Sequence, residues 1–530
     1  MLFALSSLAC SCLDEHPKDR LEEEQVYDSS KNLYINTVAT LYNYIGGNTD
    51  SQGLQGTYRG VYDYNTFTTD EAMLPTRGGD WYDGGFWQNL YLHKWTATDN
   101  ALANTWDYLY KVVVLCNQSL AAIDAHKQLL SDTEREEYKA EVRAIRAMFY
   151  YYILDMFGHV PLVTDAGTTV SDVKQSKRSE VFNFVFRELQ EILPLLPDEH
   201  SQLEGDYYGR VTRPVVCFLS AKLALNAEIY TDDDWTDGNR PDGSAILLTV
   251  DGRQMNEWKT VEYYCDALKA AGYTLADDYA DNFSVHNETS VENIFTIPMD
   301  KTLYTNQFQY LFRARHYSHG AAIGMDAENG TSATLSTVHA YGYGTDSQDK
   351  RYAINFFSGE VVVDGNTVLL DNGQSLVYEP LKIKLDLTGN PYEKTAGARM
   401  WKYEIDHTAH ADGKLQDNDI VLFRYADALL MKAEAKIRNG EDGSAELNEV
   451  RSRAGMPARE GTLANVLEER LLELMWEGWR RQDLIRFHRF TEAYDQRIPI
   501  AGEENGYTTV FPIPDKVLKL NGNLKQNPRY

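Results

Sequence analysis

Blocks of apolar residues at helical spacing occur toward both ends of this 530-residue chain. In the first block, Leu33, Val38, Leu41 and Ile45 lie on one helix face, and Gly46-Gly47 then ends the helix. The blocks are 31–45, 99–127, 132–158, 178–195, 214–230, 256–272, 418–438, 442–454, 463–477 and 480–494. Because each helix must bury its apolar face against another element, this pattern predicts a mainly α fold.

Short connections join many neighbouring blocks, which indicates helix hairpins. Segment 424–438 has alanines at positions where helices pack closely, as tetratricopeptide repeats do. We therefore expect one domain over 13–530, with a tetratricopeptide-like helix-hairpin scaffold at about 31–275 and 418–495. Long irregular insertions are expected at about 48–98 and 276–415, the second with a strand at 292–297 and a short β-hairpin at 359–370.

The charge balance restricts the ligand. The chain has 51 Lys and Arg against 79 Asp and Glu, a formal net charge of −28. A field of this sign repels phosphate backbones, so nucleic acid is not expected as a partner. A neutral or cationic ligand fits this balance better.

Metal and catalytic motifs give little support for an enzyme. Cys10-Ser-Cys12 lacks zinc spacing, and Cys116, Cys217 and Cys265 lie in apolar, helix-like sequence. The acidic loop 231–244 resembles a calcium loop, but Trp235 stands where a ligand is needed, so structural calcium is an unsupported alternative. No metal, cofactor or catalytic residue is therefore expected.

Paired acids on the later helices have a structural interpretation. Arg424 and Arg480 lie on expected helices near three acids, and buried or partly buried ion pairs that hold helices together would explain them. The candidate acids are Glu434, Glu469 and Glu477. This interpretation is favoured over a glycosidase pair, which would use a general acid and a nucleophile.

The N-terminus is typical of a lipid-anchored protein. Residues 1–9 are apolar or small, and Cys10-Ser-Cys12 is followed by Leu-Asp-Glu. This resembles the end of a bacterial lipoprotein signal, although the usual basic start is missing. Residues 1–12 are interpreted as a signal remnant with Cys12 as the lipid-modified residue, and Cys10 is the alternative.

The first insertion carries the candidate ligand site. Sugars present C–H faces, which stack on flat rings, and paired hydroxyls, which need forked polar groups. Segment 70–100 offers both kinds of side chain among closely spaced glycines. The candidate ligand-binding residues are Asp70, Arg77, Trp81, Tyr82, Asp83, Trp87, Trp95 and Asn100. We expect one or two of the tryptophans to belong to a small loop core, and Trp81 to be the most exposed.

A series of short strings, in this order along residues 12–530, resembles the SusD/RagB family of Bacteroidota surface lipoproteins. Ile145 and His159 are departures from the family pattern. The strings are Leu13-Asp-Glu-His-Pro17, Thr68-Thr-Asp-Glu71, Arg77-Gly-Gly-Asp-Trp81, Glu141-Val-Arg-Ala-Ile-Arg-Ala-Met-Phe-Tyr-Tyr151, Phe157-Gly-His-Val-Pro-Leu162, Glu292-Asn-Ile-Phe-Thr-Ile297, Arg424-Tyr-Ala-Asp-Ala-Leu-Leu-Met-Lys-Ala-Glu-Ala435, Val450-Arg-Ser-Arg-Ala-Gly455, Glu477-Gly-Trp-Arg-Arg-Gln-Asp-Leu484, Pro512-Ile-Pro514 and Gln526-Asn-Pro-Arg-Tyr530.

The resemblance implies a function. Members of this family are anchored in the outer membrane, face outward, and cover a SusC-like TonB-dependent transporter. Most bind oligosaccharides, and RagB-like members bind peptides. Their ligand site includes the segment after the Ile-Phe-x-Ile strand. Here that segment supplies Tyr304, Phe308, Tyr310 and Tyr317, of which Tyr304 is our candidate. The leading hypothesis is glycan capture for a transporter, with peptide capture as the alternative and a glycoside hydrolase as a remote one.

The lipid anchor gives a first testable prediction. Cys12→Ala, expressed from the native signal, should move the protein from the detergent phase to the aqueous phase in a Triton X-114 partition, because the acyl chains are lost. Cys10→Ala is the control and should stay in the detergent phase. The reverse result would assign the lipid to Cys10.

Overall fold

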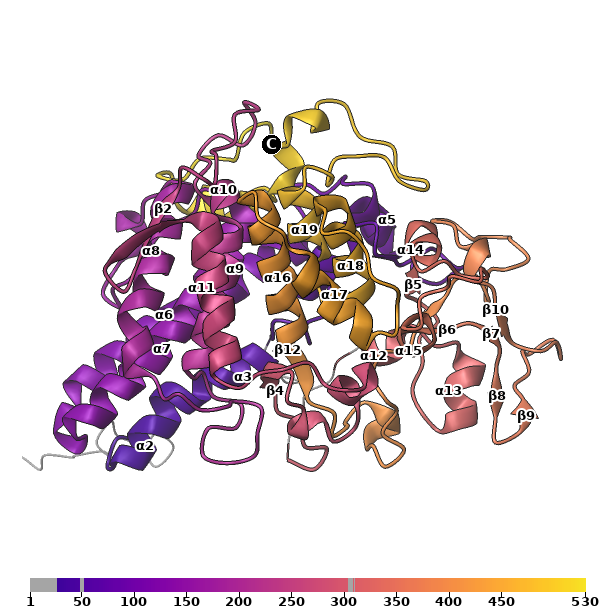
Figure 1. Ribbon diagram of the computed structural model, residues 1–530, viewed down its shortest axis with the longest axis horizontal. Coiled ribbons are helices and arrows are strands. Elements are labelled where there is room, and N and C mark those ends of the chain that lie inside the picture. Colours follow the sequence, from indigo (N-terminus) through magenta and orange to yellow (C-terminus); the bar gives the residue numbers. More distant parts are fainter. Residues whose placement is uncertain (1–25, 48–51, 304–307, 309) are drawn as a thin grey trace, which may run out of the picture.

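The computed structural model describes residues 26–47, 52–303, 308 and 310–530. Helices form most of the body, and short strands gather on the side that carries the second insertion (Figure 1). The predicted mainly α class is confirmed. Cys10, Cys12 and Tyr304 lie outside the described residues.

The N-terminal half contains the longest helices. A capping box between Ser131 and Glu134 begins α7, and Gly158, with φ of 67°, follows its last turn. The helical elements are α2 (Ser30–Tyr34), the π-helical turn η1 (Ile35–Ala39), α3 (Thr40–Gly46), α4 (Val61–Phe67), α5 (Phe86–Tyr91), α6 (Asn100–Ala125), α7 (Asp132–Phe157), α8 (Arg178–Ile192), α9 (Arg213–Leu225), α10 (Ala227–Tyr230) and α11 (Glu257–Ala270).

The C-terminal half alternates short helices with short strands. Its helices are α12 (Tyr310–Arg313), α13 (Tyr317–Ile323), α14 (Leu335–Ala340), α15 (Tyr352–Asn355), α16 (Tyr425–Arg438), α17 (Ser444–Arg453), α18 (Leu463–Leu474), α19 (Arg480–Arg486) and α20 (Asp515–Leu520). The strands of the chain are β1 (Ala72–Met73), β2 (Leu247–Val250), β3 (Arg253–Asn256), β4 (Asn293–Ile297), β5 (Ser332–Ala333), β6 (Phe356–Phe357), β7 (Gly359–Glu360), β8 (Val362–Val363), β9 (Asn366–Thr367), β10 (Val377–Tyr378), β11 (Arg399–Met400) and β12 (Ile420–Arg424).

The long helices pack one after another, as helix hairpins do. Helix α7 lies between α6 and α8, and α11 lies between α9 and α16, which also contacts α17 and α18. This series runs from the magenta helices to the orange ones in Figure 1. The C-terminal coil crosses the end of α7, where Phe511 N and Asn527 Nδ2 donate hydrogen bonds to the carbonyls of Met156 and Phe157 at 2.7 and 2.8 Å.

Two helix predictions need correction. Residues 420–424 form strand β12, antiparallel to β4 with Ile420 opposite Ile297, and the helix begins only at Tyr425. All five strand residues are buried, so the segment has the continuous apolar pattern that a buried strand and a buried helix share. The helix expected over 480–494 ends at Arg486, and His488 adopts a left-handed conformation with φ of 57°.

Both insertions contain more structure than the sequence indicated. The first includes α4, α5 and strand β1, which pairs with β5 of the second insertion. The expected hairpin near Gly365 is confirmed, since β8 pairs with β9.

A buried ion network, made of Arg351, Arg424 and Arg453 with Glu292, Glu473 and Glu477, lies where β4 and β12 meet α17 and α18. Arg424 Nη1 lies 2.8 Å from a Glu292 oxygen, and its Nη2 lies 2.8 Å from Glu477. Burial by itself raises the pKa of Glu473, but Arg453, Arg424 and Arg351 hold it well below its ordinary value. Glu473 is therefore ionised and paired with arginines.

The expected ion pairs are corrected in part. Arg424 does pair with Glu477, but from a strand end rather than from a helix. Arg480 pairs with Asp70 of the first insertion, at 2.7 Å. Glu434 pairs with Arg486, and Glu469 pairs with Arg351 and Arg451.

Glu473→Gln tests the network. It should lower the free energy of unfolding by about 3–5 kcal/mol, because three buried guanidinium groups lose a charged partner. Asp107→Asn, which breaks an exposed pair with Lys516, is the control and should cost no more than about 1 kcal/mol. Urea unfolding of the three proteins measures both values, and equal losses would contradict the assignment.

Candidate functional site

Residues 77–86 form a tight turn with unusual backbone geometry. Trp81 and Asp83 have φ of 63° and 45°, in the left-handed region that residues other than glycine rarely adopt. Such conformations cost about 1–3 kcal/mol each and persist only where surrounding contacts hold them. Arg77 and Asp80 close the base of the turn with reciprocal backbone hydrogen bonds of 2.9 and 3.0 Å. The turn thus has a fixed shape.

Trp81 fastens this turn to the second insertion. Its indole Nε1 donates a hydrogen bond of 2.8 Å to the carbonyl of Glu328. Its ring lies against Gly330, where a Cβ would lie only 2.8 Å from indole Cε2. Trp81 is therefore half-buried. It is the most exposed of the three tryptophans of the loop, as predicted, because Trp87 and Trp95 are buried.

The exposed rings are Tyr82 and Tyr317. Tyr82 is 60% exposed, and Tyr317, the first residue of α13, is 50% exposed. The Tyr317 hydroxyl donates to Asp80 Oδ2 at 3.3 Å, so the two insertions meet at this point. We call Asp80, Trp81, Tyr82 and Tyr317 the aromatic face.

The ion pair between Arg59 and Asp83 supports the turn that carries the aromatic face. Asp83 accepts a hydrogen bond from Trp87 Nε1 at 2.7 Å and pairs with Arg59 at 2.8 Å. The Arg59 guanidinium lies 5.0 Å from the ring centres of Tyr58 and Phe86. Asp83 therefore keeps its predicted place in the loop, but its known contacts hold the turn together.

Trp87 and Trp95 are core residues, which corrects their expected ligand contacts. Trp87 is only 1% exposed, and the buried guanidinium of Arg313 lies 5.4 Å from its ring centre. Trp95 is 5% exposed and donates a hydrogen bond of 2.7 Å to the Tyr530 hydroxyl. The expectation that one or two of the loop tryptophans belong to the core is therefore confirmed. Their large rings fill the interior next to the glycine-rich turn.

Arg77 and Asp70 are also structural. The buried Arg77 donates to the carbonyls of Glu393 and Ala396, at 3.0 and 2.9 Å, and to Ser332 Oγ at 2.8 Å. Both oxygens of Asp70 accept hydrogen bonds from Arg480, at 2.7 and 2.8 Å. These two side chains are occupied, so their expected ligand role is corrected.

Asn100 is exposed but lies elsewhere. It is the first residue of α6. Shortly before it in the chain, the carbonyl of Ala97 accepts a hydrogen bond of 2.9 Å from Asp515 N of the C-terminal segment. Among the described residues, no hydrogen bond or ring contact links Asn100 to the aromatic face. Tyr304 cannot be placed, because it lies outside the described residues.

Tyr58 is a residue that the sequence did not single out. Tyr317 is one of the four aromatic candidates of the second segment, among which the sequence favoured Tyr304. Tyr58 lies 6.4 Å from Trp81 and 5.5 Å from Trp87, measured between ring centres. The adjacent tyrosine and arginine, Tyr58-Arg59, were the available sequence signal for this residue.

Three further features of the described residues concern metal ligands, membrane helices and free thiols. Within residues 26–47, 52–303, 308 and 310–530, no group of three or more His, Cys, Asp or Glu could hold a metal ion. Asp233 of the acidic loop accepts hydrogen bonds from Ser179 at the start of α8 instead. The same part of the chain has no helix with the length and apolar character needed to span a membrane. Cys116, Cys217 and Cys265 are buried free thiols, as predicted.

Comparison with known proteins places the chain in a family. The model of the SusD family matches residues 255–530, and the model described as "Starch-binding associating with outer membrane" matches residues 19–225. The chain therefore belongs to the SusD family, as its motifs indicated.

Individual relatives are distant but match over nearly the full length. The chain is 24% identical to the starch-binding protein SusD of Bacteroides thetaiotaomicron, over 90% of this chain and 87% of the relative. A laminarin-binding SusD-like protein has a similar structure, with TM-score 0.69 and 18% identity over 95% of this chain and 100% of that one. Surface glycan-binding protein A of B. thetaiotaomicron, solved with laminarihexaose, gives TM-score 0.69 and 19% identity over 94% and 99%. These structures establish a shared fold.

The burial of the rings predicts opposite results for two substitutions. Trp87→Ala should lower the free energy of unfolding by about 3–5 kcal/mol, because it empties a packed site. Tyr82→Ala should change it by no more than about 0.5 kcal/mol, because the side chain is mostly in solvent. Urea unfolding followed by circular dichroism gives both values. A large loss for Tyr82→Ala would show that this ring is part of the core.

Proposed function

We propose that this protein captures an oligosaccharide or polysaccharide on the aromatic face. The observation that carries the proposal is the pair of exposed rings, Tyr82 and Tyr317, of which Tyr317 donates a hydrogen bond to Asp80, next in sequence to the half-buried Trp81. Exposed aromatic rings on a turn with strained backbone indicate a binding role, because both features have a cost in free energy.

The chemistry of the aromatic face suits a sugar. The flat sides of Tyr82 and Tyr317 can stack on C–H faces, and Asp80 can accept hydrogen bonds from a hydroxyl pair. Burial, with Asp80 as a second cause, raises the pKa of Tyr317. Its hydroxyl therefore stays protonated at neutral pH and can donate a hydrogen bond. Such a shallow site binds weakly, and several copies on one polymer compensate for this.

The family supports this proposal. One relative is named a starch-binding protein and two of the similar structures are named for laminarin or glycan binding. The two insertions that form the aromatic face here belong to the regions matched by the two family models.

We further propose that the protein acts at the cell surface. A lipid on Cys12 would hold it on the outer membrane, facing outward, and residues after the anchor would connect it to the helical scaffold. The description of the second family model, which mentions association with the outer membrane, supports this location. Bound glycan would pass to a SusC-like TonB-dependent transporter. The protein is proposed to bind and deliver its ligand without cleaving it, and without a metal or another cofactor.

Affinity electrophoresis in gels that contain starch, laminarin, xylan, mannan or fructan tests glycan capture. The wild type should be retarded by its cognate glycan. Tyr82→Ala and Tyr317→Ala should each weaken binding about fivefold, since an aromatic contact contributes about 1 kcal/mol. Tyr263→Ala is the matched control, because Tyr263 is an exposed tyrosine on α11, and it should bind as the wild type does.

Three outcomes would contradict the proposal. Equal retardation of wild type and the Tyr82→Ala, Tyr317→Ala double variant would show that the aromatic face is not the site. Binding of a peptide mixture together with no retardation by any glycan would favour peptide capture. Continued release of reducing ends by the purified protein would favour a glycoside hydrolase.

A further inference from the structure

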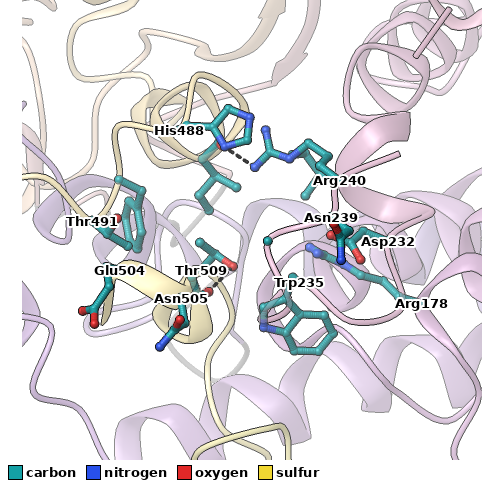
Figure 2. A pocket seen from close by; sticks show the side chains of 15 residues that line it. Arg178, Asp232, Trp235, Asn239, Arg240, His488, Thr491, Glu504, Asn505 and Thr509 are labelled. Atoms are coloured by element: carbon teal, nitrogen blue, oxygen red, sulfur yellow. Dashed lines mark hydrogen bonds between the residues drawn. The ribbon is translucent and has the colours of Figure 1, made fainter. Parts of the chain in front are cut away.

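A cavity of 170 Å³ lies between the acidic loop 231–244, the start of α8 and the C-terminal turns (Figure 2). None of its lining residues belongs to the aromatic face. Its apolar wall is formed by Ile229, Ile485 and Phe490, and Asn239 and Asn505 add polar groups. An apolar cavity of about 150 Å³ can hold benzene, so this one has room for a single six-membered ring.

Two side chains of the cavity carry N–H groups that have no hydrogen-bond acceptor. Arg178 is only 1% exposed, yet its Nε and Nη1 make no hydrogen bond with any described residue. The same holds for Nε1 of Trp235, whose ring centre lies 5.4 Å from the Arg178 guanidinium. In Figure 2 both side chains lie on the same side of the cavity, with Asp232 and Asn239 beside them. A buried guanidinium without a hydrogen-bonded partner is strongly disfavoured, so this arrangement indicates a missing acceptor.

The loop that carries Trp235 is held firmly. Both oxygens of Asp233 accept hydrogen bonds from Ser179, from its N and its Oγ, at 2.9 Å each. Arg240 donates to the carbonyls of Ile485 and Arg486, at 3.0 and 2.9 Å. A Cβ on Gly158 would lie 2.7 Å from Trp235 Cη2, so the indole lies directly on this glycine. The N–H groups of Arg178 and Trp235 that lack an acceptor are therefore fixed in position.

Two cations line the cavity and can receive an anion. They are Arg178 and Arg240, and Asp232 opposes both of them, while Asp155 acts on Arg178 and Glu228 acts on Arg240. Burial lowers the pKa of His488 to about 4, with Arg240 and Arg438 as further causes, so its ring is neutral at neutral pH. The exposed Glu504 lies at the rim.

We propose that this cavity binds a small organic carboxylate of about one six-membered ring, such as a hexuronate, through Arg178 and Trp235. The planar guanidinium and the indole N–H supply the donors that a carboxylate needs. The apolar wall selects a ligand with a carbon skeleton over a bare inorganic anion. Asn239 and Asn505 can bind its hydroxyl groups.

Isothermal titration calorimetry at low salt and near neutral pH tests the site. The probe is D-glucuronate, the neutral sugar of matching shape is D-glucose, and the inorganic anion is phosphate. The wild type should bind glucuronate and not glucose. Arg178→Met should weaken this binding at least about tenfold, since the charge-assisted hydrogen bonds from the guanidinium to the carboxylate are lost. Asp232→Asn should strengthen it, because a negative charge is removed.

Further variants separate binding from folding and from the aromatic face. Trp235→Phe keeps an aromatic ring but removes the N–H, and should weaken glucuronate binding even if Arg178→Met does not fold. The Tyr82→Ala, Tyr317→Ala variant should bind glucuronate as the wild type does. The proposal is overturned if glucuronate does not bind, if Trp235→Phe and every folded Arg178 variant bind it unchanged, or if phosphate binds as tightly.

Discussion

The buried ion network around Arg424 is the interaction on which the rest of the architecture depends. Arg424 is the last residue of β12, and Glu292 immediately precedes β4, so their ion pair joins the two ends of the second insertion. The antiparallel pairing of β4 and β12 brings these ends together, and Glu473 and Glu477 fix them to the end of α18 and the turn after it. A long irregular segment can then leave the helical scaffold and return at one point.

The two insertions meet through arginines rather than through a continuous sheet. Arg480 of α19 pairs with Asp70 within the first insertion, and Arg77 donates to carbonyl groups of the second. Trp81 follows Arg77 in the turn, donates to the carbonyl of Glu328 and packs against Gly330. The aromatic face is thus a junction between segments about 240 residues apart in sequence, as the Trp81 to Glu328 hydrogen bond shows with a separation of 247 residues.

Local patterns predicted the helices well, because an amphipathic helix carries its own period. The blocks that became α6, α7, α8 and α11 have their apolar positions and end signals within a few turns of each other. Strand β12 has no such local mark, since its five residues are all buried and its partner lies more than a hundred residues away. The cavity beside the acidic loop has no local mark in the sequence for the same reason. The loop alone resembles a calcium loop, and the role of its Trp235 becomes visible only beside Arg178.

The sequence by itself determined the helical scaffold and the family, and it identified the loop at 70–100 as the candidate ligand site. It could not decide which side chains of that loop face outward. Trp87 and Tyr82 are both aromatic and only five residues apart, yet one is buried and the other is mostly exposed. That difference depends on Arg59, Arg313 and the second insertion, which pack against the turn from distant parts of the chain. Burial is a property of tertiary packing, so only the three-dimensional structure could assign these rings.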